Sequence, residues 1–532
     1  MADVQAVIRR LGALKAIRQP LEQGWSECFD YSFPERGNGL NGSVALPSDV
    51  QSKKVRILDD TASDSARILS SSIVSGTTPA NSLWFGLDAG QESDEENRWL
   101  DEQCRQIFDN IHGSNFDSVA YECAVDMVCA GWFVMYRKWI DSDKVYNFEQ
   151  WPISQCYISS STQGGVVDTV YREVEMTVEQ IVLEYGIDKV SDKIAAAYRD
   201  EKLDDKFRIV HAIYPRQAHV VNGLMAKNMP FASCHVEVDS KQLLRESGFH
   251  KFPCIVPRWM LVPGSPYATG PMANALGSIR TINDIKALEL ANLDLATAGM
   301  WIAEDDGVLN PRAVKIGPRK VIVANSVDSM KSLTPSTDFN IVFTAEERLQ
   351  AAIRKALLAD QLQPQDGPAM TATEVHVRVQ LIRQLLGPIY GRLQAEYLQP
   401  LVDGCFDSAY RAGVLGQAPE SLQNRVFTVK YLGPLARAQR LEDVTAMDRF
   451  ETTLMSEAQA DPTVLDLYDF EEAAKQRSKF LGVPQSLLRS DDQVAKLRDS
   501  RKAVQQQQQQ QAAGQQMQQS LGEAAVQRLA AA

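Results

Sequence analysis

The sequence predicts an α+β fold in which helices predominate, and three observations lead to this class. Amphipathic segments that follow helix-start signals occupy most of the chain. Segments rich in aromatic and β-branched residues gather at residues 132–174 and 207–261. Hydrophobic residues make up 44% and charged residues 23% of the 532 positions, an ordinary globular composition. At about 100–200 residues per domain, this length predicts two to four domains.

The first 130 residues are predicted to be mainly helical. Residues 1–17 have an amphipathic pattern without the unbroken apolar stretch of a secretory signal, so we expect no signal peptide. A second helix should start at Asp60 and end at Gly76, a favourable C-terminal cap. A third helix, which follows Ser93 with the spacing of a capping box, should end near Gly113.

The following part is predicted to combine strands with one short helix. Thr177 and Gln180 have the spacing of a capping box, which predicts a helix that ends at Gly186. Strand-like segments recur from residue 207 to residue 261. Earlier strands are expected at residues 132–140, 145–151 and 166–174. An α+β body of about 260 residues follows from this pattern.

A long helix is predicted after the Gly- and Pro-rich turn at 263–271. It runs from Met272 to about Ala298 and has an apolar residue at every third position, so its apolar stripe winds around the helix. Such a helix has neighbours on more than one side. Two explanations remain open: an interior core helix, or a helix packed between copies of itself in a ring. Residues 301–343, including 339–343, are predicted to form short strands and turns.

Two further predicted helices flank a short polar loop. The segment 344–347 has capping-box spacing and opens a helix that runs to about Leu362, before Pro364 stops it. The segment 371–374 opens a second helix, which should kink at 387–388 and continue. The loop has no large apolar anchor, so it must face solvent or a partner. It comprises Gln363, Pro364, Gln365, Asp366, Gly367, Pro368, Ala369 and Met370.

A basic cluster lies between residues 312 and 331, where five basic residues occur with one acidic residue. In a chain whose net charge is −13, this local excess is either an exposed charged hairpin or a functional surface. The cluster comprises Arg312, Lys315, Arg319, Lys320 and Lys331.

The C-terminal part is predicted to be helical from about residue 432. Asp461-Pro462 is a helix-start signal, and another helix is expected at 469–481. The tail at 491–532 is rich in Gln and Ala and contains seven consecutive glutamines at 505–511. It is expected to be disordered in the free subunit, or helical where copies pack together.

No cofactor or metal site is predicted. The group His211, His219, Cys234 and His235 fits no zinc-binding spacing, so we interpret it as ordinary packing. The eight cysteines include no CxxC pair and are expected to be reduced thiols. The chain has no apolar run of about 20 residues, so no membrane contact is expected.

The sequence also predicts that the protein is not an enzyme. P-loop, dinucleotide-binding, zinc-protease and nucleophile-elbow motifs are absent from it. The pairs Asp59-Asp60 and Asp305-Asp306 imply no two-metal site, because adjacent side chains in an extended chain point to opposite faces. The acidic balance argues against a protein that binds DNA tightly through its phosphates, and it does not exclude a protein that lets DNA slide past.

Three groups of residues, taken together, resemble a known family. The first is 56–62 with 77–79 and 84–85, the second is 266–283, and the third is 370–375 with 387–388, 392–396 and 400–401. In this order they resemble the portal proteins, or head-to-tail connectors, of podovirus-type tailed bacteriophages. The resemblance covers most of residues 1–450, and the Gln-rich tail carries none of it.

The resemblance implies a subunit of a ring, commonly a dodecamer, with a wing, a stem, a clip and a crown. The loop at 363–370 would then be a tunnel loop that faces DNA. The basic cluster would lie in the clip and contact DNA or a docking partner. The implied division is a wing at 1–262, a stem helix at 263–300, the clip at 301–343, a second stem helix at 344–362, the tunnel loop at 363–370, a long wing helix and return at 371–431, crown helices at 432–490 and a tail, as a barrel inside the head, at 491–532.

The same resemblance implies partners and a location. The expected partners are double-stranded DNA in the channel, the terminase large subunit, the major capsid protein, the scaffolding protein, the tail adaptor and internal core proteins. The protein would be assembled in the host cytoplasm and reside at the portal vertex of the virion. The alternative is a non-enzymatic helical scaffold or adaptor of virion assembly that acts as a monomer or small oligomer.

Overall fold

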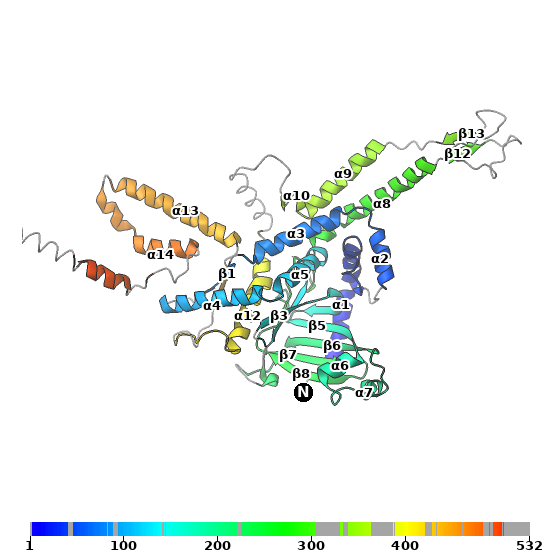
Figure 1. Cartoon of the computed structure of the whole chain (residues 1–532), viewed down its shortest axis with the longest axis horizontal. Helices are drawn as coiled ribbons and strands as arrows, with labels where there is room; N and C mark the ends of the chain where they lie inside the picture. Colours follow the sequence, from blue (N-terminus) through cyan, green and yellow to red (C-terminus); the bar gives the residue numbers. More distant parts are fainter. Residues whose placement is uncertain are drawn as a thin grey trace, which may run out of the picture. The chain divides into compact units, whose positions relative to one another are not determined.

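The computed structural model has the predicted α+β, predominantly helical class (Figure 1). It describes residues 3–40, 46–81, 83–88, 94–140, 143, 145–220, 225–298, 300–303, 330–333, 339–362, 387, 389–420, 428–431, 434–459, 461–481, 489, 493–502 and 504. The chain divides into two compact units: unit 1 is Met1–Ser82 with Asp109–Val414, and unit 2 is Leu83–Phe108 with Leu415–Ala532. Among the helices in these ranges, none is long and apolar enough to cross a bilayer.

Unit 1 contains most of the regular structure. Its helices are α1 (Val4–Asp30), α2 (Pro47–Val55), α3 (Thr61–Thr77), α5 (Phe116–Ala130), α6 (Val178–Tyr185), α7 (Asp192–Arg199), α8 (Pro271–Ala298), α9 (Phe339–Ala356), α10 (Ala359–Leu362) and α12 (Gln399–Arg411). Its strands are β2 (Val134–Ile140), β3 (Val145–Trp151), β4 (Cys156–Ser159), β5 (Thr169–Thr177), β6 (Lys206–Pro215), β7 (Phe231–Glu237), β8 (Gln242–Phe249), β9 (Cys254–Ile255), β10 (Met260–Leu261), β11 (Ala268–Thr269), β12 (Met300–Ala303) and β13 (Met330–Leu333).

The strands form two principal antiparallel sheets. The larger has the order β4-β5-β6-β7-β8, so each strand pairs with its neighbours in the sequence. The smaller has the order β3-β2-β9, and Tyr136 of β2 lies opposite Cys254 of β9. The strands predicted at 132–140, 145–151 and 166–174 correspond to β2, β3 and β5, because alternating aromatic and β-branched residues suit a half-buried sheet.

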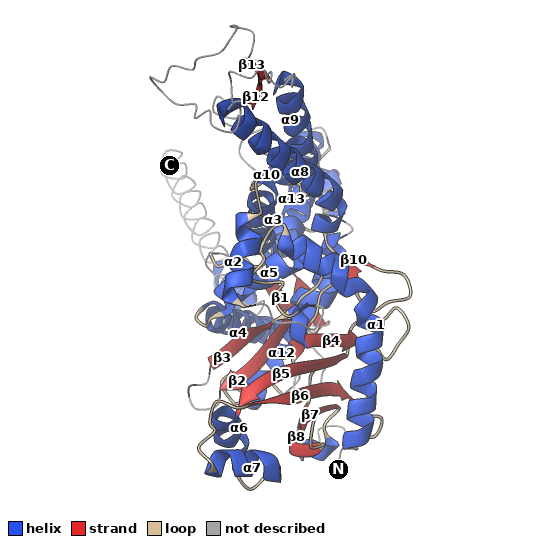
Figure 2. Cartoon of the chain, turned by 90° about the vertical axis from the view of Figure 1, so that its right-hand side faces the viewer, coloured by secondary structure: helices blue, strands red, loops and turns tan. Residues whose placement is uncertain are grey.

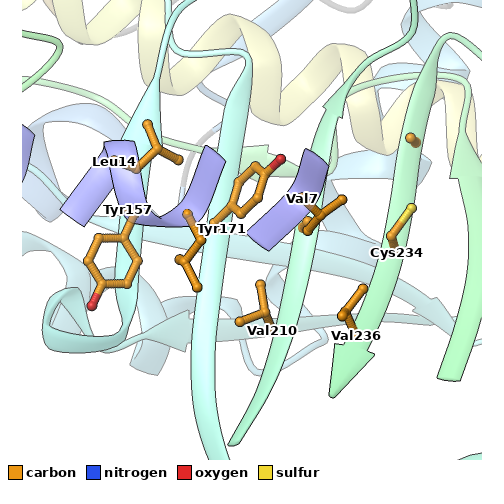
Figure 3. Packing of buried hydrophobic residues seen from close by; sticks show 10 residues of the cluster. Val7, Leu14, Tyr157, Tyr171, Val210, Cys234 and Val236 are labelled. Carbon is orange, nitrogen blue, oxygen red and sulfur yellow. The ribbon is translucent and has the colours of Figure 1, made fainter. Parts of the chain in front are cut away.

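Helix α1 covers one face of the five-stranded sheet (Figure 3). Val7, Leu11 and Leu14 recur at helical spacing, so they share one face of α1 and pack on the apolar side chains of β4 to β7. Near the end of this contact, the guanidinium of Arg18 is buried and donates hydrogen bonds to the carbonyl oxygens of Ile153 (2.9 Å), Ser154 and Cys156. The helix is therefore joined to the sheet by apolar packing and by one buried cation.

Helices α6 and α7 pack on the opposite face of the same sheet, in a cluster that includes Val178, Ile181, Ile194 and Ile209. The predicted capping box is confirmed: the Thr177 hydroxyl accepts from the Gln180 amide, and the Gln180 side chain accepts from the Thr177 amide. Gly186 follows the last residue of α6 with a φ of +84°, a conformation that favours glycine. Local sequence signals thus determine both ends of this helix.

Two histidines stack inside the protein on neighbouring strands. His211 of β6 lies opposite His235 of β7, and their ring centroids are 4.0 Å apart. The Tyr185 hydroxyl lies 2.8 Å from His235 Nδ1, and Arg245 donates to His235 Nε2 at 3.4 Å. Burial lowers the pKa of His235 to about 3 and lowers the pKa of His211 well below its usual value. Cys234 directly precedes His235 on β7. It points to the other face of the sheet, into the α1 cluster, because successive residues of a strand face opposite sides.

We predict that this histidine stack makes the protein sensitive to acid. Because both rings are held neutral in the fold, the unfolded chain binds more protons below pH 6.5, and stability falls as the pH drops from 6.5 towards 3. At pH 4.5, two units below the ordinary pKa of histidine, each ring that stays neutral accounts for about 2.7 kcal/mol, so the loss for the two rings should be on the order of 5 kcal/mol. The measurement is urea denaturation between pH 7 and 4.5. The variant H235Q should show a shallower dependence on pH, and equal slopes for the two proteins would contradict the prediction.

Helix α2 lies on the surface of unit 1, and none of its nine residues is buried. Lys53 pairs with Asp30 at 2.8 Å and Lys54 pairs with Glu35 at 3.3 Å. Val55 at its end is 70% exposed. Ion pairs on a surface contribute about 0–1 kcal/mol each, so α2 is attached more weakly than the apolar helices.

Three predicted element boundaries are wrong. Gly76 lies inside α3 rather than at its cap: the helix continues to Thr77 because the Thr77 hydroxyl donates to the Ile73 carbonyl, and Pro79 follows. Residues 339–343 were predicted as a strand but begin α9, since pairing with α8 outweighs their β-propensity. The capping-box segment 344–347 is therefore interior to α9.

The second predicted stem helix is also interrupted. It was expected to run unbroken to Leu362, but α9 ends at Ala356 and α10 begins at Ala359. Leu358 between them has a φ of +59°. Leu357 and Ala359 are both buried, so the left-handed residue turns the chain and places both neighbours in the interior.

Unit 2 is built from β1 (Phe85–Asp88), the start of α4 (Asp94–His112), β14 (Thr428–Tyr431), α13 (Pro434–Glu457), a 3₁₀ helix (Pro462–Leu467) and α14 (Phe470–Leu481). Strands β1 and β14 pair antiparallel. Arg477 of α14 pairs with Asp448 and Glu451 of α13. The predicted helix starts are confirmed, because the side chains of Asp461 and Asp469 accept the first amides of the two segments.

Candidate functional site

Most of the site residues predicted from the sequence lie outside the described residues. These are the loop Gln363, Pro364, Gln365, Asp366, Gly367, Pro368, Ala369 and Met370, and the basic residues Arg312, Lys315, Arg319 and Lys320. The fifth basic residue, Lys331, belongs to β13 and lies opposite Ile302 of β12. The structure therefore describes the elements that precede and follow both predicted sites.

The most prominent of these elements is a two-helix arm formed by α8 and α9 (Figures 1 and 2). The two helices run antiparallel, and the β12–β13 hairpin lies at the end of the pair. The other four basic residues belong to the segment that connects β12 with β13. The two strands at the end of the arm are thus the described elements that precede and follow this segment in the sequence.

An ion-pair cluster joins the two helices midway along the arm. The Lys286 ammonium donates to Glu346 on α9 at 2.6 Å and to Glu289 on its own helix at 3.0 Å. These hydrogen bonds raise the pKa of Lys286 and lower that of Glu289. The cluster fixes which residues of α8 and α9 lie side by side.

The base of the arm is tied to the N-terminal helices. The Asn283 side-chain oxygen accepts from the Leu58 amide at 2.8 Å, and the Gln350 amide group donates to Asp59 at 2.8 Å. Arg280 pairs with Glu27 of α1. One segment of the first resembling region, residues 56–62, therefore holds both helices of the arm.

Large apolar side chains are exposed along the arm. Leu288 is 65%, Leu290 48% and Leu293 53% exposed on α8, and Phe343 is 50% exposed on α9. Burial of a leucine contributes about 1.5–3 kcal/mol, so several exposed on one element indicate an interaction surface. In this part of α8, the apolar residues that wind around the helix are therefore not buried in the core of unit 1.

Two glycines set the position at which the arm leaves the rest of unit 1. Gly131 caps α5 with a φ of +90°, and a Cβ there would overlap the backbone of Thr269 and Gly270. Gly270 directly precedes α8, and a Cβ there would overlap the carbonyl oxygen of Val128. The backbones at the end of α5 and at the start of α8 thus lie in direct contact.

The helix that follows the predicted loop is anchored by a buried ion pair. Arg258 donates to both oxygens of Glu396, at 2.7 and 3.0 Å, and the two side chains are 3% and 7% exposed. Arg258 also donates to the Gly165 carbonyl at 2.9 Å. Glu396 lies in a π-helical segment, Gln394–Leu398, where the predicted sequence pattern showed an unbroken helix. No spacing rule links residues 138 positions apart, so sequence reasoning missed this pair.

The cysteines are buried, and the described carboxylates form no metal-binding cluster. All eight cysteines are free and buried, and burial raises the pKa of the Cys28 thiol to about 12. Within the described ranges, no group of three or more His, Cys, Asp or Glu side chains is arranged to hold a metal ion. The prominent features of the described residues are the exposed apolar face of the arm and the buried contacts that hold it.

Comparisons with known proteins agree along nearly the whole chain. The family model of bacteriophage head to tail connecting proteins matches residues 4–488. The chain is 28% identical to the "Probable portal protein" of Bordetella phage BPP-1, covering 93% of this chain and 90% of that protein. It is 27% identical to the "Portal protein" of Salmonella phage epsilon15, covering 94% and 91%. Similarity to the "Portal protein" of Enterobacteria phage T3 is 20% over 56% of this chain.

Proposed function

The chain belongs to the family of bacteriophage head-to-tail connecting proteins, and we propose that it forms the portal ring at one vertex of a phage capsid. The observation that carries this proposal is the match of the family model over residues 4–488, supported by portal proteins that align over 90% or more of both chains. In this role the ring is a dodecamer that surrounds a channel for double-stranded DNA, and the subunit performs no catalysis.

The proposed ring assigns each segment of the chain to a part of a portal subunit. The α8–α9 pair would be the stem, and the segment between β12 and β13, with Arg312, Lys315, Arg319, Lys320 and Lys331, would be the clip outside the capsid. Residues 1–262 would form most of the wing, 363–370 the tunnel loop, 371–431 the wing helix and return, 432–490 the crown and 491–532 the tail. The exposed leucines of the arm support its burial between subunits.

The net charge suits a channel through which DNA moves rather than a surface that binds DNA tightly. With a charge of −13 per subunit, most of the channel wall repels DNA, which carries about one charge per 1.7 Å. A few basic or neutral positions would then guide the duplex without holding it. The clip would dock the terminase large subunit during packaging and the tail adaptor afterwards, while outer surfaces contact the major capsid, scaffolding and internal core proteins.

Electron microscopy of the purified protein tests the proposal directly. Class averages should show closed rings with a central hole wide enough for a DNA duplex, and native mass spectrometry should give a single multiple of the 59.1 kDa subunit. A protein that stays monomeric or forms only small oligomers, also in the presence of capsid and scaffolding proteins, would instead be a helical adaptor of virion assembly.

Charge reversal in the clip is expected to separate docking from assembly. The variant R319E/K320E should form rings of normal size but should bind terminase weakly and package little DNA, because like charges now face the docking partner. Binding to immobilised rings and packaging in a complementation assay provide the measurements. The variant K193E/R199E makes the same charge change on the exposed face of α7 and should behave as wild type. Normal docking and packaging by R319E/K320E would remove the proposed role.

Deletion of residues 363–370 should leave rings intact but alter packaging or retention of DNA. A tunnel loop contacts the duplex and not the neighbouring core, so its loss affects DNA and not assembly. Replacement of the loop by a Gly/Ser linker of equal length is the control for chain connectivity and should share the DNA defect. Loss of the ring in both variants would show that the segment is structural packing.

A further inference from the structure

The α8–α9 arm has two outer faces that point away from each other. Lys286 and Glu346 touch, so they mark the inner faces of the two helices. A residue two positions away is rotated by about 200° around a helix, which brings it to the opposite side. Asp284 on α8 and Arg348 on α9 occupy these outer positions, and both residues are exposed.

These two outer residues lie at the same height along the arm. Because α8 and α9 are antiparallel, the step from Lys286 to Asp284 and the step from Glu346 to Arg348 lead in the same direction. Each step covers about 3 Å, at 1.5 Å per residue. Asp284 and Arg348 thus stand level with each other, on opposite sides of one two-helix layer.

The outer faces carry opposite charge. On α9, Arg348 and Lys355 share the outer face with Ala351, and all three are exposed. On α8, the outer face carries Asp284, Thr281 and Leu288, of which Leu288 is 65% exposed. Arg280, one turn before Asp284, lies beside this face, and its charge is already paired with Glu27 of α1. Nothing in the described part of the chain pairs with Asp284, Arg348 or Lys355.

A cleft of about 800 Å³ runs beside the outer face of α8, and Asp284 lines it. The cleft is also walled by α1 and α2. Its two other carboxylates, Glu27 and Asp30, are paired with Arg280 and Lys53, and its remaining cation, Arg56, is exposed. Among the described residues that line the cleft, Asp284 is thus the carboxylate without an ion-pair partner, and it can bind a partner from another molecule.

We propose that the outer face of α8 in one copy binds the outer face of α9 in the next copy, with Asp284 facing Arg348. This inference rests on the proposed ring. Rotation about a symmetry axis moves a subunit without changing its height, so residues that stand level on opposite faces meet when the arm lies along that axis. The contact buries Leu288, pairs the charges and joins unlike faces, which is the type of contact that closes a ring.

Disulfide trapping tests the pairing. The variant D284C/R348C should give a ladder of multimers up to the complete ring on a non-reducing gel after mild oxidation. The two engineered thiols of one copy are on opposite faces and cannot join each other. Background is low, because all eight native cysteines are buried. The single variants D284C and R348C should remain monomeric on the same gel, since each meets an unmodified residue on its neighbour.

A second double variant tests whether the pairing depends on the position of the residue along α9. In D284C/K355C the second thiol is displaced by seven residues, or about 10 Å, and the ladder should be largely lost. Wild-type rings in electron micrographs together with a monomeric D284C/R348C band would overturn the inference and leave the proposed function intact. Absence of rings from wild type would overturn the proposed function itself.

A charge exchange provides an independent test that does not depend on oxidation. D284R and R348D each place like charges across the contact and should reduce the ring fraction, with more free subunits in sedimentation. The combined variant D284R/R348D restores opposite charges and should recover rings. Equal ring fractions in all three variants would contradict the pairing, and so would a double variant that is more defective than either single one.

Discussion

Replacement of Arg258 by methionine is expected to lower the free energy of unfolding by about 3–5 kcal/mol. The change leaves the Glu396 carboxylate buried without its cation, at 7% exposure, and removes the hydrogen bond to the Gly165 carbonyl. The affected helix, which ends in α12, is the one that follows the predicted channel loop. Urea denaturation of R258M and of the wild type measures the difference.

The double variant R258M/E396L separates the charge effect from packing. With both partners apolar and of similar volume, much of the lost stability should return, because no buried charge remains uncompensated. K202M is the control for loss of a lysine from an exposed pair: Lys202 and Asp200 are 60% and 61% exposed, so the change should cost less than about 1 kcal/mol. A loss of under 1 kcal/mol for R258M would show that the buried pair contributes little.

Substitution of either glycine at the α5–α8 junction is expected to destabilise the subunit by at least about 2 kcal/mol. In G131A the new methyl group overlaps the backbone at 269–270, and alanine must also adopt a φ of +90°. In G270A the methyl group overlaps the Val128 carbonyl oxygen. Backbone cannot rotate aside as a side chain does, so the two segments must separate. Thermal denaturation measures the loss.

The matched control lies in α1. Nothing stands within 4 Å of a Cβ built on Gly12, which is in a helix interior, so G12A should be neutral or stabilising by up to about 1 kcal/mol. If G131A and G270A unfold at the same temperature as G12A, the close approach of the two segments does not contribute to stability. A shift in the direction of the arm in either variant would appear in ring images as an altered stem.

Elements with strong local signals were predictable from the sequence. Thr177 and Gln180 cap α6 by contacts within one turn, and Gly186 ends it, so the information is contained in ten residues. The strands Val134–Ile140 and Val145–Trp151 follow from their content of aromatic and β-branched residues. The segment 339–343 was not predictable in this way, since its residues favour a strand in isolation and adopt a helix because α8 lies beside them.

The features that give the arm its position depend on distant contacts. Gly131 and Gly270 are far apart in sequence. Each has the sequence context of an ordinary cap or turn, so their close contact could not be predicted from it. The same holds for Arg258 and Glu396. The level position of Asp284 and Arg348 required the pairing of Lys286 with Glu346, which no helical spacing rule supplies. The basic cluster, in contrast, was visible in composition alone.

The loose attachment of α2 has a practical consequence for work on this protein. A foreign peptide grafted between residues 46 and 56 would sit on the outside of the folded subunit and displace only two ion pairs, because no side chain of that helix reaches the interior. The folded subunit should therefore accept an epitope or an affinity handle at this site, but because α2 also walls the cleft beside Asp284, the handle would occupy the surface proposed for the next copy and suits work on the free subunit.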